Sequence, residues 1–127
     1  MILRLFEYNK FNLVNDLSSS LSNILPYIKI NGNLLYASTD IDKSGYPIVR
    51  IDSKKSIVGI LLKFNINSME IKSIINNTSE RGIGGRLLKI ILGKLEPGYN
   101  IIVNQDVSGG YWERVIKEYP QFKWSFI

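Results

Sequence analysis

The stretch that most constrains the fold is residues 69–95, in which three different kinds of sequence follow one another. Residues 69–77 (MEIKSIINN) predict a strand, and residues 78–85 (TSERGIGG) predict a polar turn that contains three glycines. Residues 86–95 (RLLKIILGKL) repeat apolar side chains at helical spacing and predict a helix. A strand that runs through a glycine turn into a helix presents backbone N–H groups at the positive end of a helix dipole, an arrangement that binds phosphate.

The glycines of this turn are a weak signal by themselves. Gly82, Gly84 and Gly85 carry no Cβ, so the backbone can adopt unusual torsion angles and an anionic ligand can approach it closely. Two established phosphate-binding patterns do not fit, because a dinucleotide fingerprint needs glycine in place of Leu87 and a Walker loop needs a Gly-Lys-Ser/Thr ending. A glycine-rich helix entry that only eases packing is the structural alternative.

Residues 81–88 (RGIGGRLL) resemble the cofactor loop of the GNAT acetyltransferase superfamily, written Arg/Gln-x-x-Gly-x-Gly/Ala at the start of a helix. The match departs from that pattern at Arg86, where the superfamily usually has Gly or Ala, and an arginine there could add a charged contact. The resemblance implies acetyl-CoA as the co-substrate. It implies that backbone amides of the loop hold the pyrophosphate, namely those of Arg81, Gly82, Ile83, Gly84, Gly85 and Arg86. It also implies that the backbone of Ile75 and Asn76 holds the pantetheine and that Asn104 belongs to the same site.

The rest of the chain predicts alternating helices and strands. Before residue 69 we expect a strand at 1–7, an amphipathic helix at 11–25, and strands at 27–39, 47–52 and 56–64. An Asn31-Gly32 turn interrupts the first of these later strands, and residues 40–45 form a turn. After residue 95 we expect a break at Pro97, then a strand at 100–104, a helix at 110–118 and a strand at 122–127.

This order predicts an α/β (α+β) fold with a mixed, mostly antiparallel sheet flanked by helices. The consecutive strands indicate an antiparallel meander, and the strand–helix–strand after residue 69 indicates one parallel crossover. A chain of 127 residues suits one core, so we expect a single GNAT-like domain over residues 1–127. One helix precedes the meander where the superfamily often has two, and those helices commonly help to form the acceptor site.

The absence of two residue types restricts the chemistry. The chain contains no cysteine and no histidine, which excludes disulfides, thiolate zinc sites and nucleophile–histidine pairs, and we expect no metal site. Any general base must be a carboxylate, a lysine, a tyrosine, a terminal amine or water. A mechanism that brings a cofactor and an amine together with little covalent help from the protein stays open.

The resemblance implies direct attack of a neutral amine on the thioester, assisted by a base and an acid. Glu70 is the candidate base, acting directly or through water, and Asp106 and Asp40 are weaker alternatives. The structural alternative is that Glu70 and Lys72, two residues apart, share a solvent-facing side of the strand.

The candidate acid depends on how the helix after residue 104 is aligned with the superfamily. Tyr111 stands seven residues after Asn104, which matches the spacing to the superfamily's tyrosine. Aligning the helix pattern instead places Trp112 at that position, and tryptophan cannot usefully protonate a thiolate. We favour Tyr111, and the alternative is that both residues are core or rim aromatics.

The formal net charge of +5 favours anionic partners such as nucleotide cofactors, nucleic acid or acidic surfaces. No recognisable nucleic-acid-binding motif is present, and neither a membrane-spanning run nor a signal peptide is evident, so we expect a cytoplasmic protein without a membrane partner. The acceptor would be a small-molecule or protein amine, and the aromatic C-terminal strand could pair with another copy to give a homodimer. Two alternatives remain: a non-catalytic protein of the same fold that binds a CoA-type ligand or a macromolecule, and a basic nucleic-acid-binding module.

Overall fold

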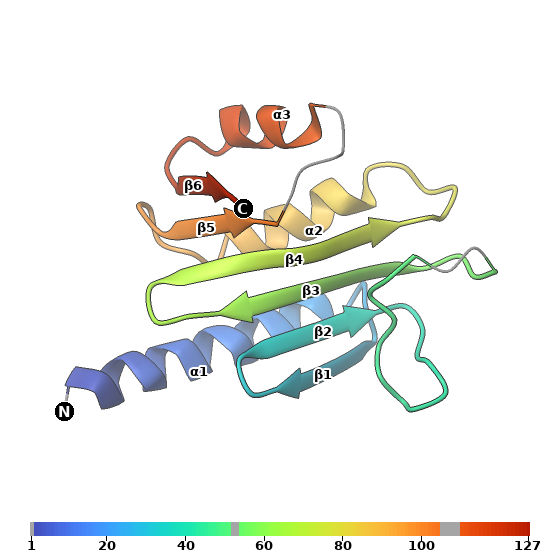
Figure 1. Cartoon of the computed structure of the whole chain (residues 1–127), viewed down its shortest axis with the longest axis horizontal. Helices are drawn as coiled ribbons and strands as arrows, with labels where there is room; N and C mark the ends of the chain where they lie inside the picture. Colours follow the sequence, from blue (N-terminus) through green and yellow to red (C-terminus); the bar gives the residue numbers. More distant parts are fainter. Residues whose placement is uncertain (1, 52–53, 105–109) are drawn as a thin grey trace.

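The computed structural model describes residues 2–51, 54–104 and 110–127, with side chains from residue 12 onward (Figure 1). Its first part consists of α1 (Ile2–Leu21), β1 (Tyr27–Asn31), β2 (Leu34–Ser38), β3 (Val58–Phe64) and β4 (Ser68–Asn76). Its second part consists of α2 (Ile83–Leu92), β5 (Asn100–Val103), α3 (Tyr111–Glu118) and β6 (Lys123–Phe126). The predicted mixed α/β class is confirmed.

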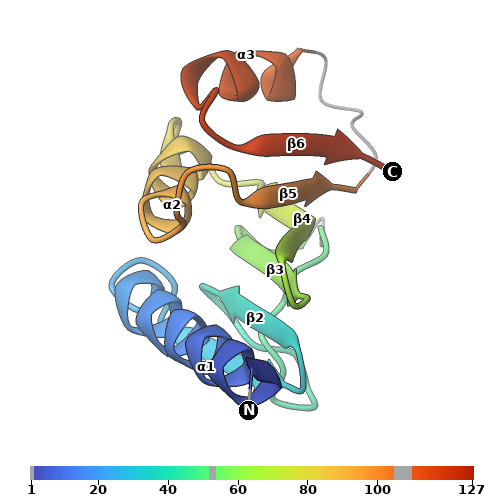
Figure 2. The same cartoon turned by 90° about the vertical axis from the view of Figure 1, so that its left-hand side faces the viewer.

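All six strands lie in one sheet, in the order in which they occur along the chain. Strands β1 to β4 are antiparallel neighbours, whereas β4 pairs with β5 and β5 with β6 in parallel. The predicted meander and the crossover after it are therefore both confirmed, and a second parallel crossover through α3 follows. Figure 2 shows α1 and α2 on the same side of the sheet, with α3 beyond β6.

One buried cluster joins this face of the sheet to the helices. Leu17 and Leu21 of α1, Leu87 and Ile91 of α2 and Phe64 of β3 are each 0% exposed. The spacing of four residues within each helical pair places both side chains on one face, which explains why these segments pack as amphipathic helices. Within the described ranges, no helix combines the length and the apolar character that crossing a membrane would require.

The predicted strand at residues 1–7 is wrong over its described part, because α1 is already helical at Ile2 and continues to Leu21. The apolar residues near the start are not strictly alternating, and no proline or glycine separates them from the helical pattern that follows. Nothing in the sequence therefore ends a helix between residues 7 and 11. The chain enters the sheet only at β1.

The predicted strand at 47–52 is also wrong over its described part, where only Pro47 forms an isolated bridge, with Ile41. Pro47 has no N–H to donate to a ladder, and the Ile48 N–H donates to the Asp40 carbonyl instead. Residues 46–51, called the strap from here on, cross the sheet face that α1 and α2 leave uncovered.

The strap lies so close to β3 that only glycine fits beneath it. A Cβ on Gly59 would stand 2.4 Å from the Ile48 carbonyl oxygen, so the Gly59→Ala variant must push the strap away from the sheet. We expect its free energy of unfolding to fall by about 1–3 kcal/mol in urea titrations, the usual cost of overpacking. Gly85→Ala, where a Cβ would meet open space inside α2, is the matched control and should lose no stability. Equal stability of the two variants would contradict the close contact.

Candidate functional site

A cleft lies where β4 and β5 part. Their pairing runs from Ser68 opposite Asn100 to Ile71 opposite Val103, and the Asn104 N–H then donates to the Ile71 carbonyl at 3.2 Å. Strand β4 continues to Asn76 beyond that point, paired with β3 but not with β5. The register between β3 and β4 shifts in this part of the strand, leaving Lys72 without an opposite residue.

A pocket of about 440 Å³ fills this parting of the strands. Its walls come from the free edge of β4, from the first turn of α2, from the end of β5 and from the start of α3. The lining residues are Ile71, Lys72, Ser73, Ile74, Ile75, Asn76, Gly82, Gly84, Gly85, Val103, Asn104, Tyr111 and Trp112. The structure thus brings together most of the residues that the sequence predicted for the cofactor site.

The glycine turn enters α2 earlier than predicted. Gly82 has a left-handed backbone (φ 83°), α2 begins at Ile83 rather than Arg86, and it ends at Leu92, followed by Gly93, rather than at Leu95. The Arg86 N–H donates to the Gly82 carbonyl at 3.1 Å, which makes it the first helical hydrogen bond. No side chain caps the helix, so the N–H groups of residues 83–85 are free of helical partners at its positive end.

The glycines leave room on the cleft side of this helix end. A Cβ on Gly82 or Gly85 would meet nothing within 4 Å, and a Cβ on Gly84 would stand 3.6 Å from the Tyr111 hydroxyl oxygen. The backbone is therefore exposed to the pocket, and Tyr111 lies opposite it.

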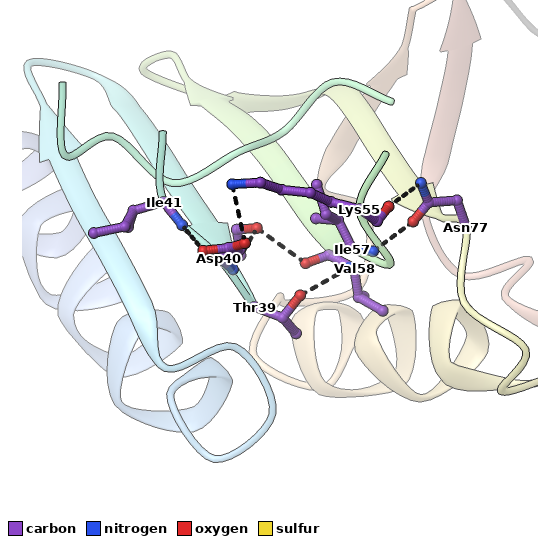
Figure 3. A network of polar contacts seen from close by, with 8 residues as sticks. Thr39, Asp40, Ile41, Lys55, Ile57, Val58 and Asn77 are labelled. Carbon is purple, nitrogen blue, oxygen red and sulfur yellow. Dashed lines mark hydrogen bonds and ion pairs between the residues drawn. The ribbon is translucent and has the colours of Figure 1, made fainter. Parts of the chain in front are cut away.

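Two asparagines hold the turn between β4 and α2. The Asn76 side chain accepts hydrogen bonds from the Thr78 N–H (3.0 Å) and hydroxyl (2.6 Å), and donates to the Glu80 carbonyl at 2.8 Å. Asn77 binds the connection between β2 and β3. Its side chain donates a hydrogen bond to the Lys55 carbonyl at 2.7 Å and accepts one from the Ile57 N–H (Figure 3). The start of the turn is thus fixed before any ligand binds.

The backbone N–H and C=O groups of successive β4 residues point alternately toward β3 and toward the cleft. This alternation decides which of them a ligand in the cleft can reach. Gly59 lies opposite Ile75, and the Asn77 N–H donates to the Ile57 carbonyl at 3.1 Å. Because hydrogen-bonded and non-hydrogen-bonded pairs alternate, the polar groups of Ile75 face β3 and those of Ile74 and Asn76 face the cleft. The sequence predicted that the backbone of Ile75 and Asn76 holds the ligand; both residues line the pocket, but of these two only Asn76 turns its backbone polar groups toward it.

Glu70 lies on the strap side of the sheet, since it alternates with Met69 and Ile71 of the core. It is 8% exposed, and its Oε2 accepts a hydrogen bond from Asn104 Nδ2 at 3.2 Å and lies 3.6 Å from Lys72 Nζ. Glu70 does not line the pocket itself, but both of its partners do. Glu70, which is buried, and Lys72, which is exposed, therefore form an ion pair beside the cleft. They are not two independent solvated side chains.

Tyr111 and Trp112 both line the pocket, in different environments. Trp112 is 5% exposed and packs at 6.3 Å from the Trp124 ring, so it belongs to the core beside β6. Tyr111 is half-buried, with its hydroxyl opposite Gly84. Burial raises the pKa of the Tyr111 phenol above its ordinary value, and the Arg114 charge partly opposes this shift. The phenol therefore keeps its proton throughout the neutral range.

The charged residues predicted near the loop are exposed. Arg86 forms an ion pair with Glu80 at 3.5 Å between two largely exposed side chains, and Arg81 has no ion pair with any residue of the described ranges. Asp40, the alternative base, pairs with Lys55 at 3.4 Å and does not line the cleft. The other alternative, Asp106, lies outside the described residues.

The sequence did not predict a place in the cofactor site for Lys72, Ser73 and Ile74, although all three line the cleft. Their position follows from the register shift and from the end of the β5 pairing, and neither has a signature in the local sequence. Comparison with known proteins finds no matching family model, no matching curated protein and no matching solved structure.

Proposed function

We propose that the protein is an acetyl-CoA-dependent N-acetyltransferase that works in the manner of the GNAT superfamily. The observation that carries this proposal is the meeting of three features at one pocket: an unpaired strand edge, an uncapped glycine-rich helix start and the hydroxyl of a half-buried tyrosine. Each suits a different part of an acetyl-CoA molecule. Their combination is more specific than the glycine motif alone.

The chain's groups fit such a co-substrate. The free N–H groups of residues 83–85 would bind the pyrophosphate, and the open space at Gly82 and Gly85 would admit it. The backbone of Ile74 and Asn76 would bind the pantetheine amides in the way a neighbouring strand would. The pocket volume of about 440 Å³ lies in the usual range for small-molecule sites.

Acetyl-CoA would supply a thioester whose carbonyl carbon forms a bond to the acceptor nitrogen while the carbon–sulfur bond breaks and its electron pair leaves with sulfur. Glu70 would receive the proton that the ammonium form of the acceptor must lose, through water that contacts Lys72 and Asn104. The Tyr111 hydroxyl would give its proton to the departing sulfur, and the second proton, which the acceptor nitrogen loses as the amide forms, would restore the phenol. Cleft walls on both sides would position the reactants, which itself lowers the barrier.

The experiment that tests the proposal combines calorimetry with thiol detection. The purified chain should bind acetyl-CoA with a micromolar dissociation constant and release CoA thiol faster in the presence of a suitable amine. Saturable binding without turnover over a broad panel of amines and proteins would favour a non-catalytic protein of the same fold. A folded protein that does not bind acetyl-CoA would overturn the proposal.

A further inference from the structure

A second pocket lies on the face of the sheet that carries Glu70. Its volume is about 660 Å³, and the strap forms most of its wall together with Tyr36 of β2 and Asp42 of the preceding turn. The sheet beneath the strap presents a row of directly paired residues, Lys29, Tyr36, Leu61 and Ser73, one from each of β1 to β4. The strap follows this row from the edge of the sheet to the cleft.

Contacts at both ends fix the strap. At the β1 end, the Tyr46 ring packs edge-on against Tyr36, with 5.3 Å between the ring centroids. Lys29 Nζ lies 4.1 Å from the centroid of the Tyr46 ring, and Asn31 Nδ2 donates a hydrogen bond to the Tyr46 hydroxyl at 3.3 Å. At the β4 end, the Ser73 hydroxyl donates to the Val49 carbonyl at 2.7 Å. The second pocket is therefore largely preformed, as small-molecule sites usually are.

The Ser73–Val49 hydrogen bond also joins the two pockets. Ser73 lines the cleft between β4 and β5, and Val49 lines the pocket of the strap. The two pockets are therefore neighbours across this hydrogen bond, and a ligand in the second pocket would lie close to Ser73 of the cleft. This is the side on which the acceptor amine would meet Glu70.

The charges indicate what kind of acceptor this pocket suits. Three charged side chains line the two pockets over the described residues: Lys72, Asp42 and Arg50. Lys72 pairs with Glu70, and Asp42 Oδ1 accepts from the Ser44 hydroxyl at 2.6 Å and from the Ser44 and Tyr46 N–H groups. Arg50 is exposed and has no ion pair or hydrogen bond with any residue in the described ranges.

We infer that the second pocket binds the acceptor, and that the acceptor is a small amine bearing a carboxylate that Arg50 holds. This inference rests on the proposed function. A guanidinium group matches a carboxylate with two parallel hydrogen bonds, and the neighbouring Ile51, 73% exposed, offers an apolar contact. An acceptor with several positive charges would instead be repelled by Arg50, whereas Lys72 is already paired with Glu70.

The test compares matched acceptors, each a small amino acid and its carboxamide, at saturating acetyl-CoA. The amine of the carboxamide is less basic, so a larger fraction of it is in the neutral, reactive form. A preference of the enzyme for the acid would therefore run against the intrinsic reactivity of the two amines. We expect the acid to have the higher kcat/KM, and Arg50→Gln to lower it by about 10- to 100-fold through KM while leaving the carboxamide unchanged. Lys43→Gln, on the same connection but lining neither pocket, is the control and should change neither.

Calorimetry with acetyl-CoA on each variant separates this inference from the proposed function. Unchanged acetyl-CoA binding with a selective loss of the acid substrate in Arg50→Gln would support the inference. Equal use of acid and carboxamide, turnover confined to peptides or polyamines, or no turnover of any acid by a chain that binds acetyl-CoA would overturn it. A chain that does not bind acetyl-CoA would overturn the proposed function, and the inference with it.

Discussion

Gly84→Glu should raise the dissociation constant for acetyl-CoA at least about 100-fold, because it places a carboxylate where a phosphate would bind. Gly84 lines the cleft in the first turn of α2, and a Cβ there would already stand 3.6 Å from the Tyr111 hydroxyl oxygen. The new side chain would also fill the space between α2 and Tyr111. Calorimetric titration of the variant and the parent with acetyl-CoA measures the change.

The same substitution should leave the fold intact. A glutamate in the first turn of a helix interacts favourably with the helix dipole, and it replaces a glycine whose flexibility disfavours the helix. We therefore expect an unfolding midpoint equal to or above that of the parent. An unchanged or higher midpoint would show that weaker binding in Gly84→Glu comes from a damaged binding site and not from unfolding.

Two controls identify the cause of weaker binding. Gly84→Gln adds nearly the same volume without the charge, and Gly84→Ala adds only a Cβ at an ordinary contact distance. Affinity should fall in the order Ala, Gln, Glu. Equal acetyl-CoA affinity in Gly84→Glu and the parent would show that the glycine turn serves packing alone.

The middle of the chain could be predicted well because its signals are local. The apolar spacing of Leu87, Leu88 and Ile91 depends only on the helix period, and the Asn31-Gly32 hairpin turn depends only on backbone preferences. Both features appear where expected, with errors of a few residues at the boundaries. Helix α2 begins earlier than predicted because Gly82 adopts a left-handed conformation just before it. A glycine in a sequence does not show which backbone torsion angles it will adopt.

The errors arose where distant residues decide the structure. Residues 47–51 contain enough apolar side chains for a strand, but Gly59 and Ser73, which are far along the chain, hold them as the strap. The cleft likewise depends on where β5 ends beside β4 and on a register shift between β3 and β4. A single sequence contains no record of such pairings, so the positions of Lys72, Ile74 and Arg50 at the two pockets could only be found in three dimensions.

Tyr111→Phe should lower kcat by about 100-fold or more while leaving the acetyl-CoA dissociation constant nearly unchanged, the usual effect of removing a general acid. The phenyl ring keeps the contact with Trp112, whose ring centroid lies 5.2 Å from that of Tyr111, so the cleft wall stays in place. Only the hydroxyl is lost. Tyr119→Phe removes a hydroxyl just beyond the end of α3, outside this cleft, and should retain full activity.

The pH dependence gives a second signature of the same role. A phenol donates its proton only while it is protonated, and burial raises the Tyr111 pKa above the ordinary value of 10.0. The acetyl-transfer rate of the parent should therefore decline only above pH 10.0, as Tyr111 ionises. The residual rate of Tyr111→Phe should lack this decline, whereas Tyr119→Phe should keep it.

Trp112→Phe decides between the two alignments of this helix. Trp112 is 5% exposed and packs against Trp124, so the smaller ring should lower stability without removing a group that can donate a useful proton. We expect a reduced unfolding midpoint with kcat close to that of the parent below that midpoint. A loss of kcat in Trp112→Phe that equals the loss in Tyr111→Phe would mean that α3 acts by shaping the cleft, and the hydroxyl opposite Gly84 would then have no catalytic role.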